Sequence, residues 1–177
     1  IEDAAYAFLA DDPPAPLAAL APERTVYVSG LSKNVATGLR VGFVAAPLPW
    51  IPALERSIRA TVWNTPGVMT SIACNWLDDG TVLRLEQQKR EDARHRQALA
   101  RATLRGLPFT SHPNACFLSL PLGEEVRADQ IAMALLRENV SVSTAEPFAT
   151  SSHVPHAIRL ALGSLALDSL QTARETV

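Results

Sequence analysis

The chain has 177 residues, of which 47% are apolar and 19% charged, and its formal net charge is -2. This composition is that of an ordinary globular protein, so it excludes a disordered chain, a collagen-like repeat and a disulfide scaffold. It also predicts no nucleic-acid binding by this segment, because no surplus of basic residues is present to neutralise a phosphate backbone.

Neither a membrane span nor a disulfide is expected. The longest uncharged apolar run, residues 41–54, contains three prolines and is shorter than the roughly 20 residues that cross a bilayer. With Cys74 and Cys116 as its two cysteines, we expect a reduced, cytoplasmic protein in which both are buried small hydrophobic residues. The chain begins at Ile1 with neither an initiator methionine nor the regions of a signal peptide, so we expect a fragment that begins inside a fold.

The first fifty residues predict loops and two short strands. Residues 11–16 are rich in proline and predict a loop, and residues 17–20 form at most one helical turn. Residues 25–28 are β-branched and aromatic and predict a strand, and residues 41–46 predict a second one. Because both strands are largely apolar, we expect both to be buried.

Helices are predicted through the middle of the chain. The apolar residues of 52–60 and 68–77 recur at helical spacing, and residues 64–67 (Asn-Thr-Pro-Gly) separate the two segments. Residues 81–104 lack Pro and Gly and predict a long, largely solvated helix of the kind that connects two lobes. The three tryptophans are interpreted as core or interface anchors: Trp50, Trp63 and Trp76.

Beyond residue 106 strands and helices alternate, which predicts a compact α/β unit over residues 106–177. The expected strands are residues 115–120, 140–143 and 157–162, and the expected helices are residues 128–138 and a final helix from Leu167 onward.

Lysine is rare in this sequence, which contains Lys33 and Lys89 against fourteen arginines. Lys89 lies in a polar run, residues 87–92, and is interpreted as part of a solvated helix face. Lys33 directly follows a predicted buried strand, in a loop at a strand end, where the active-site groups of α/β sheets collect. A lysine in a desolvated or cationic setting can form a Schiff base with a carbonyl, although this position alone also allows an ordinary surface role.

Other polar residues near strand ends have two interpretations each. Arg40 stands between Gly38 and Gly42, where its guanidinium can grip an anion or cap the edge of the sheet. Asp3 and Tyr6 lie just past an apparent strand end. A carboxylate there can hold a protonated ring nitrogen and a phenol can bond a nearby oxygen, or both can belong to an exposed turn.

Arg159 is a lone charge inside the apolar strand predicted over residues 157–162. Charged residues seldom occupy such positions without a partner. The sequence therefore predicts that Arg159 binds an anionic ligand or a buried carboxylate.

Several common motifs are absent. A serine β-lactamase signature needs a serine three residues before the lysine, and Gly30 stands there. The sequence has neither a phosphate loop ending in Gly-Lys-Ser/Thr nor a Gly-x-Gly-x-x-Gly motif. His153 and His156 have no further ligand at a metal-like spacing, so no metal site is predicted.

Taken together, these motifs resemble the second half of a fold-type I pyridoxal-phosphate (PLP) aminotransferase of class I/II, closest to the aminotransferase-like domains of MocR-type regulators. The motifs that carry the resemblance are Asp3-x-x-Tyr6, Ser29-Gly-Leu-Ser32-Lys33, Gly38-Leu-Arg40-Val-Gly42 and Arg159 in a late strand. The resemblance covers essentially the whole chain. It implies an α/β fold with the end of the large-domain sheet in residues 1–66, connecting helices in residues 67–105 and a small α/β domain in residues 106–177.

The resemblance also implies roles for individual residues. Lys33 would form the Schiff base with pyridoxal 5'-phosphate, Asp3 would pair with the ring nitrogen and Tyr6 would bond the phenolic oxygen. Arg40 would hold the phosphate, and Arg159 would bind the substrate carboxylate in a two-pronged hydrogen bond.

The phosphate contacts depart from the family pattern. Many relatives carry a Ser or Thr three residues before the lysine, where this chain has Gly30. Ser29 and Ser32 lie on either side, so either hydroxyl is a candidate for the phosphate contact. The Gly/Ser loop, stacked aromatic ring and Asn that the first half of such enzymes supplies are not found here.

The resemblance predicts a homodimeric enzyme that moves an amino group between an amino acid and a 2-oxo acid. An alternative is the effector-sensing domain of a MocR/GntR-type transcriptional regulator, whose DNA-binding segment would lie outside this sequence. A third interpretation is an α/β interaction fragment with no activity. Decarboxylase, lyase and racemase chemistry use the same scaffold and stay open.

Overall fold

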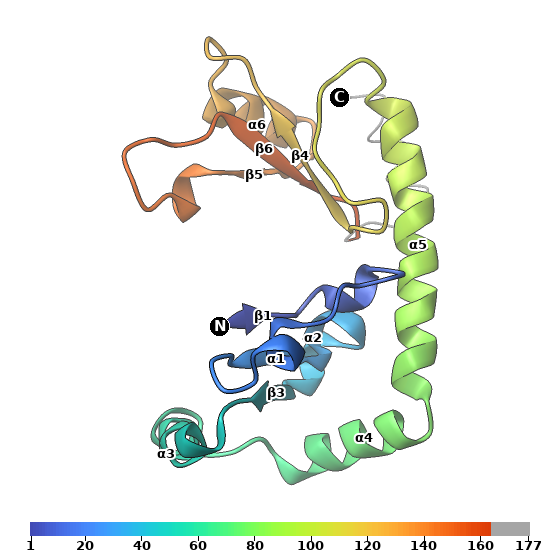
Figure 1. The fold of residues 1–177 in the computed structure, drawn as a ribbon. Coiled ribbons are helices and arrows are strands. Elements are labelled where there is room, and N and C mark those ends of the chain that lie inside the picture. Colours follow the sequence, from blue (N-terminus) through green and yellow to red (C-terminus); the bar gives the residue numbers. More distant parts are fainter. Residues whose placement is uncertain (164–177) are drawn as a thin grey trace. The chain divides into compact units, whose positions relative to one another are not determined.

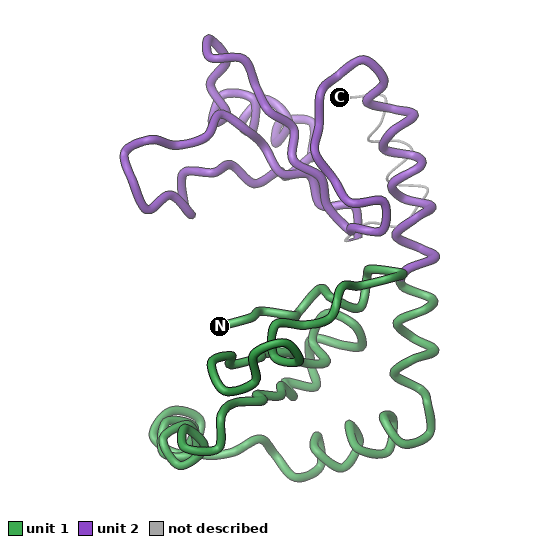
Figure 2. The backbone as a smooth tube through the Cα atoms, in the orientation of Figure 1, with its two compact units in different colours: residues 1–89 green, residues 90–177 purple. Residues whose placement is uncertain are grey.

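A computed structural model describes residues 1–163 of the chain, shown in Figure 1. It divides into two compact units, residues 1–89 and residues from 90 onward, coloured separately in Figure 2. The division falls inside one helix, within the connecting region 67–105 that the sequence predicts. The three-part domain division stays a prediction, and the two units are described in turn.

A three-stranded sheet forms the centre of the first unit. Its strands, in spatial order, are β1 (Glu2–Asp3), β2 (Tyr27–Gly30) and β3 (Gly42–Ala45). β1 runs parallel to β2 with Asp3 opposite Val28, and β3 runs antiparallel to β2 with Gly42 opposite Gly30. The carboxyl ends of β1 and β2 and the start of β3 therefore lie at the same end of the strands, which we call the carboxyl edge of the sheet.

Helices account for most of the remaining ordered backbone in the first unit. The α-helices are α1 (Leu17–Leu20), α2 (Leu31–Asn34), α3 (Ile51–Thr61), α4 (Gly67–Asp78) and the start of α5 (Thr81–Thr103). Short 3-10 helices are η1 (Ala7–Leu9), η2 (Thr37–Leu39) and η3 (Leu48–Trp50). The helices predicted over residues 52–60, 68–77 and 81–104 are thereby confirmed, and so is the single helical turn at residues 17–20.

The buried side chains of the first unit join α2 and η2 to the helices that follow much later in the chain. They are Leu31, Leu39, Val41, Ala73 and Val82, with Val35, Met69, Ile72 and Trp76 packed against them. Burying one such aliphatic side chain contributes about 1.5–3 kcal/mol. The segment after β2 is thus stabilised by packing against α4 and α5, because its own helices are too short to be stable alone.

The expectation that both early strands are buried is wrong. All four residues of β3 are exposed, and those of β2 are half-buried. The apolar run predicted a strand covered on both faces, but β3 is the edge strand of its sheet and leaves Phe43 and Val44 41% and 44% exposed.

A second, antiparallel sheet organises the other unit. Its strands, in spatial order, are β4 (Phe117–Pro121), β6 (Ala157–Ala161) and β5 (Ser143–Thr144), and they are accompanied by α6 (Ala128–Arg137) and η4 (Glu146–Phe148). The strands and the helix predicted there are confirmed, with β5 starting later than expected. The final helix predicted from Leu167 lies outside the described residues.

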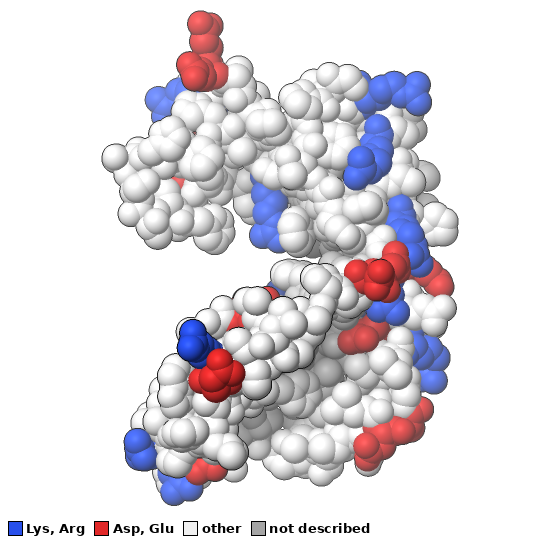
Figure 3. Space-filling view, in the orientation of Figure 1, with Lys and Arg blue, Asp and Glu red and all other residues white. Residues whose placement is uncertain are grey.

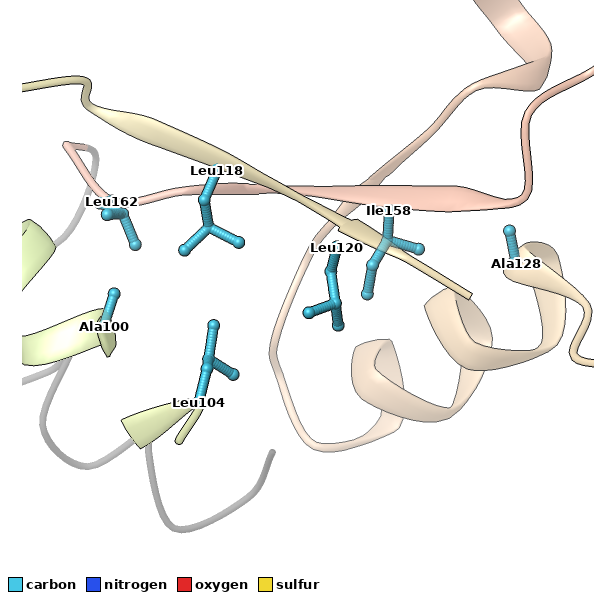
Figure 4. Packing of buried hydrophobic residues seen from close by; sticks show 7 residues of the cluster. All are labelled: Ala100, Leu104, Leu118, Leu120, Ala128, Ile158 and Leu162. Atoms are coloured by element: carbon cyan, nitrogen blue, oxygen red, sulfur yellow. The ribbon is translucent and has the colours of Figure 1, made fainter. Parts of the chain in front are cut away.

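The core of this second unit is drawn in Figure 4. Its buried members come from α5, β4, α6 and β6 and from the residues just after α5 and β6: Ala100, Leu104, Leu118, Leu120, Ala128, Ile158 and Leu162. Alternate residues of β4 and β6 enter this core, as a strand with one covered face requires.

Helix α5 presents a charged surface and a small buried stripe. In Figure 3, acidic and basic side chains are interspersed along it, in agreement with a largely solvated helix. Two polar residues of its second half are nevertheless buried, Arg96 and Gln97. Arg96 Nη1 donates to the carbonyl of Leu162 at 2.7 Å and Gln97 Nε2 donates to that of Ala115 at 2.8 Å, so α5 anchors loops of the second unit through polar contacts.

Two smaller expectations need correction. Cys74 is exposed and Cys116 half-buried, so neither cysteine is the buried hydrophobic residue that was expected. Trp76 packs against the core, as one of the two interpretations of the tryptophans predicts, whereas Trp50 and Trp63 are 52% and 71% exposed, so for them only the interface interpretation stays open. None of the helices within residues 1–163 combines the length and apolarity needed to cross a bilayer.

Candidate active site

The carboxyl edge of the first sheet collects four of the residues singled out by the sequence. Asp3 ends β1, Lys33 follows the end of β2 by three residues, and Arg40 precedes β3 by two. Tyr6 lies three residues past Asp3, at the start of η1. Because the ends of β1 and β2 and the start of β3 meet at one edge, the topology brings these side chains to the same side of the sheet, where α/β proteins bind ligands.

Asp3 closes the turn that follows β1. Its Oδ1 accepts a hydrogen bond from the backbone N–H of Ala5 at 3.0 Å, while the N–H of Ala4 donates to the carbonyl of Val28 at 2.8 Å. One carboxylate oxygen thus orients the side chain, which stays exposed at the edge. The arrangement leaves a negative charge available to a cationic or N–H-bearing ligand.

Lys33 lies in a helix and not in the loop that was expected. The four residues of α2 place Leu31 and Asn34 inward, at 1% and 8% exposed, while Lys33 is exposed. Residues three apart lie on the same face of a helix, so the two buried residues turn Lys33 away from the core. Its Nζ is 5.7 Å from the centre of the Tyr6 ring, which puts the amine beside the phenol.

The glycine at position 30 is required by the backbone around it. A Cβ added there would lie 2.9 Å from the carbonyl oxygen of Val41 and 3.1 Å from the Cα of Gly42, too close for any side chain. A serine or threonine at this position would push β3 away from β2. Position 30 therefore cannot carry a hydroxyl group. The nearest hydroxyl groups in the sequence belong to Ser29 and Ser32, which are both half-buried.

Arg40 adopts a left-handed backbone conformation, with φ of 54°. Its neighbours Leu39 and Val41 are both buried, at 7% and 6% exposed, whereas Arg40 itself is exposed. The left-handed turn lets the flanking residues enter the core while the guanidinium remains outside. For a residue with a Cβ this conformation costs roughly 1–2 kcal/mol, which the burial on either side offsets.

Arg159 belongs to the second unit and is described there alone. It is exposed and not enclosed, because Ile158 and Leu160 take the core-facing positions of β6. Its guanidinium carbon lies 4.3 Å from the centre of the Phe117 ring. Within residues 1–163 no carboxylate forms an ion pair with Arg159, so the buried carboxylate, one of its two expected partners, is absent, and the guanidinium stacks on an aromatic ring.

A shallow hollow surrounds Arg159. It has a volume of about 400 Å³, and its polar lining includes Ser119 and Ser143. These two serines sit directly opposite Arg159 on the neighbouring strands, one on each side. The guanidinium is thus flanked by small hydroxyl groups, an arrangement suited to an anion such as a carboxylate.

Sequence reasoning missed two residues at the lysine-bearing edge. Lys89 was assigned to a solvated helix face, but it is half-buried and its Nζ donates to the carbonyls of Lys33 and Val35 at 3.0 and 3.1 Å. Glu86 accepts a hydrogen bond from the Nδ2 of Asn34 at 2.7 Å. The spacing of buried Val82, Glu86 and Lys89 places all three on one helix face, and that periodicity was the available signal.

Nearly the whole chain matches a known protein family. The family described as "Aminotransferase class I and II" matches residues 1–176. The chain belongs to this family. Among curated relatives, the uncharacterized HTH-type transcriptional regulator YdeF of Bacillus subtilis is 24% identical over 92% of the chain, and 2-aminoadipate transaminase of Thermus thermophilus is 25% identical over 79% of it.

The fold agrees with that membership. The crystal structure of LysN, an alpha-aminoadipate aminotransferase from Thermus thermophilus, matches 98% of the chain with a TM-score of 0.87 at 22% identity. The chain accordingly has the α/β fold of part of a fold-type I PLP-dependent transferase. It covers 47% of the LysN chain, 35% of YdeF and 36% of the transaminase, so it spans between a third and a half of their lengths.

Proposed function

We propose that the protein is a PLP-dependent aminotransferase that moves an amino group between an amino acid and a 2-oxo acid. The observation that carries the proposal is an exposed lysine amine beside a phenol, at the sheet edge that also bears a carboxylate and a guanidinium. Membership of the class I and II aminotransferase family supports the same reaction class.

The residues at this edge fit pyridoxal 5'-phosphate by their chemistry. The ligand has an aldehyde, a ring nitrogen, a phenolic oxygen and a phosphate, and the edge offers an amine, a carboxylate, a phenol and a guanidinium. Each group is matched by a partner of suitable charge or hydrogen-bonding capacity. When bound, the cofactor supplies an aldehyde that takes up the amino group and a ring that withdraws electrons from the substrate's α carbon.

Lys33 is the residue that would join covalently to the cofactor. Its amine would also be the group that takes the proton from the substrate's α carbon and returns it elsewhere. Asp3 would hold a proton at the ring nitrogen, because a nearby negative charge favours the protonated form of a base. Tyr6 would donate its hydroxyl hydrogen to the phenolic oxygen.

Two anionic groups need ligands, the cofactor's phosphate and the substrate's carboxylate. Arg40 is the proposed phosphate ligand, and its left-handed backbone keeps the guanidinium at the sheet edge. Ser29 and Ser32 are the proposed hydroxyl donors to the same phosphate. Arg159 would bind the substrate carboxylate, since a planar guanidinium forms two parallel hydrogen bonds with that group.

Covalent trapping tests the assignment of Lys33. The full-length protein is mixed with pyridoxal 5'-phosphate, reduced with borohydride and mapped by peptide mass spectrometry. We expect the reduced cofactor on the peptide that contains Lys33 and none in the Lys33→Ala variant, with the Lys89 peptide as the internal control. Attachment that persists in Lys33→Ala would show that another amine carries the cofactor.

A second candidate function is an effector-sensing domain of a MocR/GntR-type regulator. The match to YdeF over 92% of the chain favours it. A sensor would attach the cofactor at Lys33 but transfer no amino group. Turnover measured with a panel of amino acids and 2-oxo acids separates the two functions, because an enzyme shows product formation with at least one pair.

We also propose a homodimer. Exposed apolar side chains on and beside α3 support it, including Ile58, Trp50 and Trp63 at 45%, 52% and 71% exposed. Exposed apolar side chains that gather on one segment are a common feature of protein interfaces. Light scattering of the full-length protein is expected to give twice the mass of one chain, and a monomer at micromolar concentration contradicts this part of the proposal.

A further inference from the structure

The two lysines of this sequence meet in the fold. Lys89 lies on α5, 56 residues beyond Lys33, and its ammonium group donates hydrogen bonds to the backbone carbonyls of Lys33 and Val35. The two N···O distances are 3.0 and 3.1 Å. One positively charged group thus binds both carbonyls at the end of α2, the helix that carries the reactive lysine.

A second residue of α5 holds the same helix. Glu86, one turn before Lys89, accepts a hydrogen bond from the Nδ2 of Asn34 at 2.7 Å. Asn34 is only 8% exposed, and its Oδ1 has no hydrogen-bond partner within residues 1–163. The contact with Glu86 therefore satisfies the Nδ2 group of this buried amide, and its loss would leave both polar atoms of the amide without a partner.

These contacts matter because α2 is too short to hold itself. A helix of four residues is not stable in isolation, and its last carbonyls have no partner inside the helix. A cation at the carboxyl end of a helix is favourable, since the carbonyl dipoles point toward it. The direction of the Lys33 side chain depends on the backbone that these contacts fix.

We propose that Glu86 and Lys89 are positioning residues that hold α2 so that the amine of Lys33 faces its ligand; we call this pair the α2 clamp. The inference rests on the proposed function of Lys33. Neither residue is assigned a contact with cofactor or substrate, and both act through the backbone and the Asn34 side chain of α2.

The first test measures how fast the cofactor joins Lys33 in the full-length protein. Aliquots are reduced with borohydride at increasing times, and the Lys33 peptide is quantified. Lys89→Met keeps the length of the side chain but removes its donors, and we expect attachment to slow by about tenfold, as loss of charged hydrogen bonds allows. Lys89→Arg should restore the rate to within about threefold, because its guanidinium also donates to carbonyls.

A matched control comes from the next residue along α5. Gln88 is exposed, so Gln88→Met introduces the same side chain without touching α2 and should keep the wild-type rate. A wild-type rate in Lys89→Met overturns the proposal. A rate equally slow in Lys89→Met and Lys89→Arg also overturns it. Such a result would mean that hydrogen-bond donors at position 89 do not matter and that both variants merely disturb the packing.

The second test needs no cofactor. The amide hydrogens of Val35 and Ala36 both bond to the carbonyl of Leu31 at 3.0 Å, so their exchange with deuterium reports opening of α2. We expect exchange in residues 31–36 to be about tenfold faster in Lys89→Met and in Glu86→Ala than in the wild type or Gln88→Met. Unchanged exchange in either clamp variant overturns the proposal, and the Glu86→Ala arm keeps it testable if Lys89→Met does not fold.

The two tests separate this proposal from the one on which it rests. If the wild-type protein attaches no cofactor at Lys33, the proposed function fails while faster exchange in the variants would still establish the clamp. If the wild type attaches cofactor and the variants match it in both rate and exchange, the clamp fails and the proposed function stands.

Discussion

Lys33 and Arg159 are held in different ways by the two units. Arg159 lies in the middle of β6, which is paired on both sides, so the strand register alone determines which face it occupies. Lys33 lies on a four-residue helix whose position depends on contacts from α5, 56 residues away. A paired strand thus positions a side chain through the backbone hydrogen bonds to its neighbouring strands. A short helix is positioned by contacts with another element.

The largest effect is expected from truncating one core leucine in each unit. Leu118 is 0% exposed and Leu31 is 1% exposed. Each leucine-to-alanine change should lower the free energy of unfolding of its own unit by about 2–5 kcal/mol, measured by urea titration with hydrogen exchange as the local probe. Leu31→Ala should also slow cofactor attachment at Lys33, and Leu118→Ala should not. Equal attachment rates in the two variants would contradict the comparison.

A smaller effect is expected from Arg159→Lys. Lysine cannot form the two-pronged hydrogen bond with a carboxylate, so we expect KM for the amino acid to rise about tenfold. Cofactor attachment at Lys33 should be unchanged, because the two residues are proposed to bind different groups. Arg137→Lys, an exposed arginine of α6 in the same unit, is the matched control. A KM within about twofold of the wild type would remove Arg159 from the substrate site.

Arg40→Gly should separate stability from function. Glycine adopts φ of 54° without the steric cost that an arginine bears, so the first unit should become more stable by about 1 kcal/mol. The affinity for pyridoxal 5'-phosphate should fall at the same time, because a phosphate ligand is lost. Thermal melting and a cofactor titration measure the two effects, and unchanged cofactor affinity would show that Arg40 does not hold the phosphate.

The smallest effect concerns pH and the start of α5, the helix that carries the α2 clamp. The side-chain and backbone hydrogen bonds from Thr81 lower the pKa of Asp79, and its Oδ1 accepts the Thr81 N–H at 2.8 Å. A lowered carboxyl pKa stabilises the fold fully above the unfolded-state value of about 3.9, and this contribution is lost as the pH falls through the folded-state value.

Asp79→Asn keeps an acceptor at this helix start but cannot be protonated in that range. We therefore expect the wild type to melt at a higher temperature than the variant near neutral pH, and this difference to disappear as the pH falls below about 4. Asp78→Asn is the neighbouring control. Identical acid profiles for wild type and Asp79→Asn would show that the hydrogen bond contributes nothing to acid stability.

The longer helices of both units and the strands of the second unit were predictable, because local sequence patterns determine them. Apolar periodicity located α3 and α4, the lack of Pro and Gly located α5, and the alternation of strand and helix patterns beyond residue 106 located β4, α6 and β6. The burial of β3 was mispredicted because an apolar run does not reveal whether a strand lies at the edge of its sheet. The charge of Arg159 predicted an anionic ligand or a buried carboxylate, because the sequence does not show that the pleat of the central strand β6 turns this side chain to the exposed face.

The sequence singled out residues for the candidate site, but it predicted their arrangement only in part. Asp3, Tyr6, Lys33 and Arg40 were singled out by residue type and position near strand ends, and the sheet topology brings them to one edge. Lys89 was assigned to solvent because its neighbours in the sequence are polar. The spacing of Val82, Glu86 and Lys89 indicates a shared face of α5, but it does not specify that this face contacts α2.

The sequence by itself determined the longer helices and most of the strands, and it determined the chemical groups available to the site, because both depend on side-chain type and local spacing. The tertiary structure alone decided that α2 is a helix held by Glu86 and Lys89, that β3 is exposed and that position 30 has no room for a side chain. Those features arise from contacts between segments that are distant in the chain. Such contacts contribute free energy only once the segments have packed together.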